Sequence, residues 1–180
     1  MIQGATTLRL RPYAPDDESA ARRAHEQSLE EGAHFLLDWE PTMSWSQFLQ
    51  GVDEQPLGLN PSEYRVRGTQ LAAVVDDVLV GRASVRFELN EFFASRGGHI
   101  GYVVLAPYRR RGYATQILRL ALGVAHENGV ASALLVCDDD NVASANVIER
   151  CGGVLESVES SGEGGERWRR YWIETSSPTR

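Results

Sequence analysis

The sequence is poor in cysteine and lacks long hydrophobic runs. Cys137 and Cys151 are its only cysteines, too few for a disulfide framework, so a reducing compartment is expected. No apolar stretch is long enough to cross a membrane, and no apolar core follows Met1–Gly4, as a signal peptide would require. These absences predict a cytoplasmic protein that has no membrane partner.

The sequence also lacks the motifs of several ligand classes. It has neither the Gly-Lys-Ser/Thr of a P-loop nor the three spaced glycines of a dinucleotide site. Its four histidines are scattered and no cluster of metal ligands is visible, so no metal site is expected. Acidic residues outnumber basic ones by 25 to 18, and the net charge of −7 argues against a nucleic-acid binder with a basic face.

The remaining composition is that of a soluble globular protein. With 180 residues, of which 42% are hydrophobic and 24% charged, the chain is long enough for one domain with a substantial core. We expect this domain to span residues 1–175 and residues 176–180 to form a loose tail. The acidic balance is compatible with a cationic amine as substrate, and both a monomer and a homodimer are left open.

Hydrophobic periodicity predicts an α/β protein with the order strand, two helices, three strands, helix, strand, helix and two strands. Ser44 and Gln47 form a capping box that would open the second helix, and Asp76-Asp77 is expected to turn a hairpin. The expected strands are 7–11, 71–75, 78–89, 99–105, 133–137, 154–158 and 168–173, and the longer helices are about 16–31, 113–128 and 142–150.

The segment 103–114 joins an apolar strand to a helix through a sharp turn, three arginines and Gly112. The first turn of a helix has unpaired N–H groups and partial positive charge, which together favour an anion such as phosphate. Gly112 has no side chain and Ala114 a small one, so a phosphate can approach the backbone closely. The alternative is a basic helix start that binds no ligand.

The motif Arg109-x-x-Gly112-x-Ala114, placed directly after a strand, resembles the pyrophosphate loop of the GNAT superfamily of acyl-CoA-dependent N-acetyltransferases. The pattern of that loop is Gln/Arg-x-x-Gly-x-Gly/Ala. The predicted element order is also that of GNAT proteins, so the resemblance covers nearly the whole chain and is densest from His99 to Gly153. The segment 97–102, Cys137-Asp138 and the segment 170–173 look like a little-described branch of predicted bacterial acetyltransferases.

This resemblance implies a GNAT fold, with a mixed central sheet of about six to seven strands flanked by about four helices. It implies acetyl-CoA as cosubstrate, no metal, and transfer of the acetyl group to a primary amine by direct attack. The acceptor would be a small molecule or a peptide. The alternative function is a catalytically silent CoA-binding sensor or interaction module of the same fold. A GNAT fold without any cofactor is a third interpretation, against which the intact loop argues.

The resemblance also assigns cofactor contacts. In the family the pantetheine arm lies against the strand before the loop, where a bulge frees main-chain groups. This implicates the main chain of Tyr102, Val103 and Val104. Asn141 matches the asparagine that bonds the pantetheine arm, although it is equally placed to cap a helix. Ser144 and Asn146, on the following helix, would add polar contacts. The pyrophosphate would meet the N–H groups of residues Arg109, Arg110, Arg111, Gly112, Tyr113 and Ala114.

The sequence defines the general acid and the general base less well than it defines the cofactor contacts. Many family members carry a tyrosine, proposed to protonate the leaving thiolate, seven residues after the asparagine, but this chain has Ile148 there. Either another group protonates the thiolate or none is needed. The fourth strand has no carboxylate where the family often places the base. The candidates for the base are Asp138, which could also solvate a loop, His99, which could also be structural, and Glu88.

The segment 34–52 is rich in aromatic residues. In GNAT-like proteins this early helical region forms one wall of the acceptor site. Phe35, Trp39 and Trp45 therefore either line the acceptor site or belong to the hydrophobic core. Cys137 is expected to be a small buried apolar residue and not a nucleophile, because no His–Asp pair is evident beside it.

Overall fold

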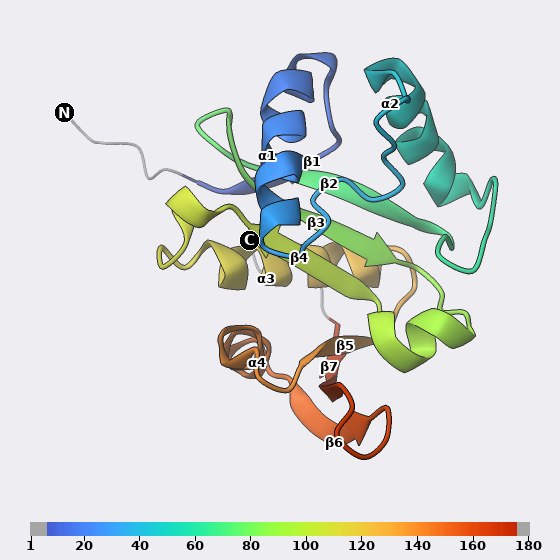
Figure 1. The fold of residues 1–180 in the computed structure, drawn as a ribbon, viewed down its shortest axis with the longest axis vertical. Coiled ribbons are helices and arrows are strands. Elements are labelled where there is room, and N and C mark those ends of the chain that lie inside the picture. The colour runs from blue at the N-terminus through green and yellow to red at the C-terminus, as the bar shows by residue number, and fades with distance from the viewer. Residues whose placement is uncertain (1–6, 176–180) are drawn as a thin grey trace.

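The computed structural model describes residues 7–175. Within these residues the chain forms seven strands and four α-helices in the predicted order (Figure 1). Residues 1–6, which we predicted to belong to the domain, and the predicted tail 176–180 lie outside the described residues. The elements are β1 (Arg9–Arg11), α1 (Glu18–Glu30), α2 (Trp45–Glu54), β2 (Gly68–Val75), β3 (Val78–Arg86), β4 (Ile100–Val104), α3 (Tyr113–Glu127), β5 (Ser132–Asp138), α4 (Val142–Arg150), β6 (Val154–Ser160) and β7 (Arg167–Glu174).

The strands form two antiparallel sheets, in the orders β1-β2-β3-β4 and β5-β7-β6. The strand number agrees with the expectation, but the strands do not form one continuous mixed sheet. The reason is that β4 and β5 do not pair: within residues 7–175 their segments are joined by hydrogen bonds between His99, which directly precedes β4, and Leu134 of β5. Beyond that point the two strands diverge, and Figure 1 shows the second sheet below the first with α4 beside it.

The hydrophobic core has two parts, one on each face of the four-stranded sheet. On one face, α3 and α4 pack through apolar residues such as Ile117, Leu118 and Ile148. On the other face, α1, α2 and the segment before α2 pack through residues such as Phe35 and Trp45 (Figure 1). Both rings are buried, so the core interpretation holds for them, whereas Trp39 is only partly buried.

Local sequence signals explain most of the element ends. Ser44 accepts from the Gln47 N–H and the Gln47 side chain accepts from the Ser44 N–H, which is the predicted capping box. The connector 90–98 differs from expectation because it contains one π-helical turn, Phe93–Gly97. Strand β3 ends at Arg86, so Glu88 lies beyond it. No helix within residues 7–175 is both long and apolar enough to cross a bilayer.

Candidate functional site

The junction between the two sheets is held by the segment before β4. The His99 imidazole accepts the Leu134 N–H at Nδ1 over 2.9 Å, while the His99 N–H donates to the Leu134 carbonyl. Gly98 adopts a φ of +65°, and a Cβ there would lie 2.5 Å from the Leu134 oxygen. The sheets therefore approach closely at this point only, and the fourth-strand position where the family often has a carboxylate leaves no room for one.

The main chain of β4 provides polar groups that face the gap between the sheets. The Leu105 N–H donates to the Val80 carbonyl and the Arg86 N–H to the His99 carbonyl, so odd-numbered residues of β4 face β3. Because the direction alternates along a strand, the N–H groups of Tyr102 and Val104 point into the gap and that of Val103 does not. The pairing of β3 with β4 shows no register shift, so divergence of the strands, and not a bulge, frees these groups.

The loop after β4 forms an open anion site at the start of α3. Gly112 is the N-cap of α3 in the left-handed conformation, with a φ of +78°, and no side chain caps the helix. A Cβ at this residue would meet no atom within 4 Å, so the helix N-terminus is open to a ligand. Arg110 also has a positive φ of +63°. The exposed N–H groups and the helix dipole fit a pyrophosphate.

The three loop arginines have different roles in the structure. Arg109 donates through Nε to the Val104 carbonyl over 3.0 Å and pairs with Glu31 at the end of α1, which lowers the pKa of that carboxyl. Arg111 donates to the Pro107 carbonyl over 3.1 Å. Arg109 thus fastens the loop to β4 and α1, whereas Arg110 and Arg111 are exposed at the helix start. Direct phosphate contact by these side chains remains a prediction.

The start of α4 closes the other side of the gap. The Asn141 side chain accepts the Ser144 N–H over 3.0 Å, so Asn141 is the helix cap, and it also lines the gap. The Ser144 hydroxyl is 2.9 Å from the Tyr102 hydroxyl. Burial raises the pKa of Tyr102 to about 12, although the bond to Ser144 opposes this. Asn146 is exposed and does not line the gap, and Tyr113 and Ala114 form the first turn of α3.

A cavity of about 260 Å³ passes through the gap between the sheets. On the α4 side it is lined by Tyr102, Ser144 and Ile148. Arg82, which donates to the His34 carbonyl in the segment before α2, and Trp168 also line it. The cavity, the main chain of β4 that faces the gap and the uncapped start of α3 together offer polar groups suited to the amides and the pyrophosphate of a CoA molecule.

The structure separates the three candidates for the base. Asp138 is exposed at the end of β5 and lines the cavity. His99 is committed to Leu134, and burial, followed by the nearby Arg86 charge, lowers its pKa. Glu88 is exposed, lies 3.9 Å from Arg67 and does not line the cavity. Of the three, only Asp138 lines the cavity. Burial raises the pKa of Cys137, which keeps this thiol protonated.

The sequence reasoning missed Arg82 and Trp168, although both line the cavity. An arginine inside an apolar strand, Val78–Arg86, was the one available signal for Arg82, because charged residues are rarely fully buried. Trp168 carried no such signal, because its position follows from the folding of the β6–β7 hairpin against the first sheet. Its ring lies 4.1 Å from the Arg96 guanidinium.

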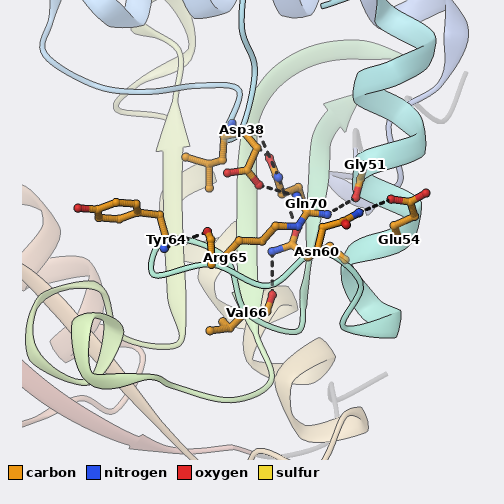
Figure 2. A network of polar contacts seen from close by, with 11 residues as sticks. Asp38, Gly51, Glu54, Asn60, Tyr64, Arg65, Val66 and Gln70 are labelled. Carbon is orange, nitrogen blue, oxygen red and sulfur yellow. Dashed lines mark hydrogen bonds and ion pairs between the residues drawn. The ribbon is translucent and has the colours of Figure 1, made fainter.

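A second cavity of about 440 Å³ lies beside α2. Figure 2 shows Arg65 across its floor, bonded to Asp38 over 2.7 Å and to the Gly51 carbonyl. The Gln70 side chain of β2 also lines this cavity. It accepts the Leu37 N–H over 3.3 Å and so connects β2 to the segment before α2. The partly exposed ring of Trp39 is part of the wall, so this predicted acceptor-wall residue faces a cavity. Residues 7–175 hold no group of three or more acidic, histidine or cysteine side chains fit for a metal ion.

Comparison with known proteins identifies similar sequences and folds. The family model for the acetyltransferase (GNAT) domain matches residues 7–154. A solved structure of RimL, the ribosomal L7/L12 α-N-protein acetyltransferase in complex with coenzyme A, is 19% identical, with 97% of each chain covered and a TM-score of 0.68. None of the curated protein sequences matches this chain.

Two further solved structures share this fold. The putative acetyltransferase yncA from Salmonella typhimurium, with acetyl-CoA, is 12% identical over 96% of this chain and 98% of its own, with a TM-score of 0.61. The ribosomal-protein-S5-alanine acetyltransferase from Vibrio fischeri is 17% identical over 96% of each chain, with a TM-score of 0.65. At these low identities the likeness establishes the fold.

Proposed function

The chain belongs to the GNAT acetyltransferase family, and we propose that it transfers the acetyl group of acetyl-CoA to a primary amine by direct attack. Acetyl-CoA is the cosubstrate, and similar structures contain CoA or acetyl-CoA. The observation that carries the proposal is the cavity between the sheets, because residues of β4, of β5 and of the start of α4 line it together. The acceptor would be a small molecule or a peptide.

The reaction needs few groups from the protein. The amine nitrogen attacks the thioester carbon, the carbon–sulfur bond breaks, the sulfur leaves as a thiolate and the nitrogen loses one proton. The Tyr102 N–H, which points into the gap, would stabilise the negative charge that develops on the carbonyl oxygen. Asp138, at the edge of the cavity, would accept the amine proton directly or through water.

The Tyr102 hydroxyl has a different role from the family tyrosine that Ile148 replaces. Its pKa of about 12 lies well above that of a thiol, near 8.5, so it keeps its proton in the presence of a thiolate. It would therefore stabilise the leaving sulfur by a hydrogen bond without transferring a proton. Ser144, which bonds this hydroxyl, would hold it in place.

The test measures thiol release from acetyl-CoA with a panel of primary amines, and mass spectrometry identifies the N-acetylated product. The chain contains no lysine, so acetylation of its own lysine side chains cannot contribute to the signal. We expect Asp138→Asn to lower kcat about 10- to 1,000-fold with acetyl-CoA affinity nearly unchanged, because only the proton acceptor is lost. Glu88→Gln is the matched control and should keep the full rate.

Two results would contradict parts of this proposal. If Asp138→Asn keeps the full rate, the amine loses its proton to solvent, and the rate should rise with pH toward the amine's own pKa. If acetyl-CoA binds but no amine releases thiol, the chain is the CoA-binding module considered above. The substitution of Ile148 for the tyrosine and the lack of an acid at Gly98 are the observations that favour that second function.

A further inference from the structure

Arg82 is a buried cation that has no carboxylate beside it. The residue is 7% exposed, and its Nη2 donates to the His34 carbonyl over 2.8 Å and its Nη1 to the Ser84 hydroxyl over 3.2 Å. Its Nε is buried without a partner. Within residues 7–175, none of the ion pairs involves Arg82 or Arg86. A buried charge without a counterion costs several kcal/mol, so such groups are rare outside binding sites.

A second arginine, which is partly buried, adds positive charge near Arg82. Arg86 follows on the same face of β3, donates to the Gly98 carbonyl over 3.1 Å and lies 4.0 Å from the Phe93 ring. Burial, followed by the charge of Arg82, lowers the pKa of Arg86 to about 10. Burial also lowers the pKa of Arg82. In both cases burial is the main cause, and neither guanidinium has a carboxylate within ion-pair distance among the described residues.

The Arg82 guanidinium faces the cavity on its acceptor side. It lies over Gly101 of β4, where an added Cβ would be 3.5 Å from Arg82 Nη1 and 3.0 Å from the Ser84 hydroxyl. Gly101 directly precedes Tyr102, whose N–H points into the gap toward the proposed carbonyl site. Arg82, Gly101 and Tyr102 all line this cavity, so the guanidinium and the proposed carbonyl site open into the same space.

We propose that Arg82 binds a carboxylate of the acceptor, and that the acceptor is an α-amino acid. This inference rests on the proposed acetyl transfer at the same cavity. An α-amino acid is the most compact amine that also carries a carboxylate, which suits a cavity of about 260 Å³ that is lined by both Arg82 and Tyr102. The buried Tyr13 hydroxyl, which also has no partner, cannot replace this anion because burial raises its pKa and keeps it neutral.

The first test compares each amino acid with its own carboxamide as acceptor, using thiol release. The carboxamide removes the charge and keeps the amine and the side chain. Because the carboxamide also lowers the amine pKa, intrinsic reactivity favours the amide, so a preference for the acid must come from the protein. We expect kcat/KM to be about 10- to 100-fold higher for the acid, the value of a hydrogen bond to a charged group.

The second test changes the arginine. Arg82→Met should abolish the preference for the acid over the amide, and Arg82→Lys should restore part of it. Arg86→Met is the matched control, because Arg86 is partly buried on the same strand face but does not line the cavity, and it should keep the preference. A purely structural Arg82 would lower the rates with acid and amide equally.

Two further measurements distinguish failure of this proposal from failure of the proposed function. Calorimetry of wild-type protein loaded with CoA should show binding of an N-acetylamino acid at least 10-fold tighter than that of its carboxamide, which needs neither turnover nor a variant. Amide-capped dipeptides with Asp or Glu as second residue test a peptide as the source of the same carboxylate. The proposal would be overturned if the enzyme acetylated these dipeptides and not free amino acids. It would also be overturned if the N-acetylamino acid and its carboxamide bound equally well. Absence of acetyl-CoA binding would instead overturn the proposed function.

Discussion

At the scale of single residues, Gly112 connects an unusual backbone conformation to the chemistry of a ligand. Its left-handed φ turns the chain into α3 and leaves the first N–H groups of that helix without a side-chain cap. Open space surrounds the position of a Cβ, so the surrounding protein does not require glycine for steric reasons. The requirement comes from the conformation and from a ligand that approaches the backbone.

We predict that Gly112→Asp reduces acetyl-CoA affinity at least 100-fold, because a carboxylate would stand beside the pyrophosphate. The measurement is calorimetry, with stability followed by denaturant unfolding. Gly129→Asp is the matched control, since Gly129 has a φ of +85°, equally open space and a position at the opposite end of α3. Both variants should lose about 1 kcal/mol of unfolding free energy, and only the first should lose binding. Normal binding by Gly112→Asp would place the phosphate site elsewhere.

The sequence alone was sufficient to predict residues that act on their neighbours along the chain. Asn141 and Gly112 act on the next turn of their own helices, so a cap motif and a strand–turn–helix pattern reveal them. Arg82 is different, because its partner His34 is 48 residues away and its burial depends on how the segment before α2 packs. Asn146 is exposed on α4 and does not line the cavity, and the sequence alone does not show which face of that helix meets the gap.

At the scale of elements, the relation between β4 and β5 determines the site. Each strand was predictable from its apolar residues, but their divergence was not, because it depends on contacts that residues 98 and 99 make with Leu134. The His99 side chain takes the place of a main-chain acceptor at this junction. The structure therefore explains His99 as the clamp between the two sheets, which was one of the two alternatives that the sequence left open.

We predict that His99→Phe destabilises the fold by about 1–3 kcal/mol, because the Leu134 N–H would lose its acceptor. His99→Asn should recover much of this loss, since its Oδ1 can accept the same bond, and it should retain thiol release. The measurement is chemical unfolding of both variants. A folded His99→Asn protein without thiol release would instead support His99 as the base.

The same clamp predicts a pH dependence of stability. The folded-state pKa of His99 is lowered, by burial first and by Arg86 second, so protonation favours the unfolded chain. This contribution to stability is present above the unfolded pKa, near 6.5, and is lost as pH falls through the folded pKa. His99→Asn should therefore lose less stability than wild type between neutral and acidic pH.

At the scale of the whole molecule, two sheets with separate hydrogen-bonded ladders share one ligand gap. The order of elements predicted this family fold, because alternating strands and helices restrict the possible topologies. The order alone does not reveal that the sheets are separate, since strand pairing depends on long-range contacts. A ligand that contacts β4, α3 and α4 at once would tie the two halves together.

We predict that acetyl-CoA at 100 times its dissociation constant stabilises the protein by about 2.7 kcal/mol, which raises the melting temperature by roughly 5–10 °C. Hydrogen exchange should show where this stabilisation arises. The N–H groups of Tyr102 and Val104, which face the gap, should exchange more slowly with the ligand. Those of Val103 and Leu105 already face β3, so their exchange should change much less. Equal protection of all four amides would mean that the ligand stiffens the strand without bonding its gap-facing groups. A temperature shift without any protection of β4 would place the ligand outside the gap.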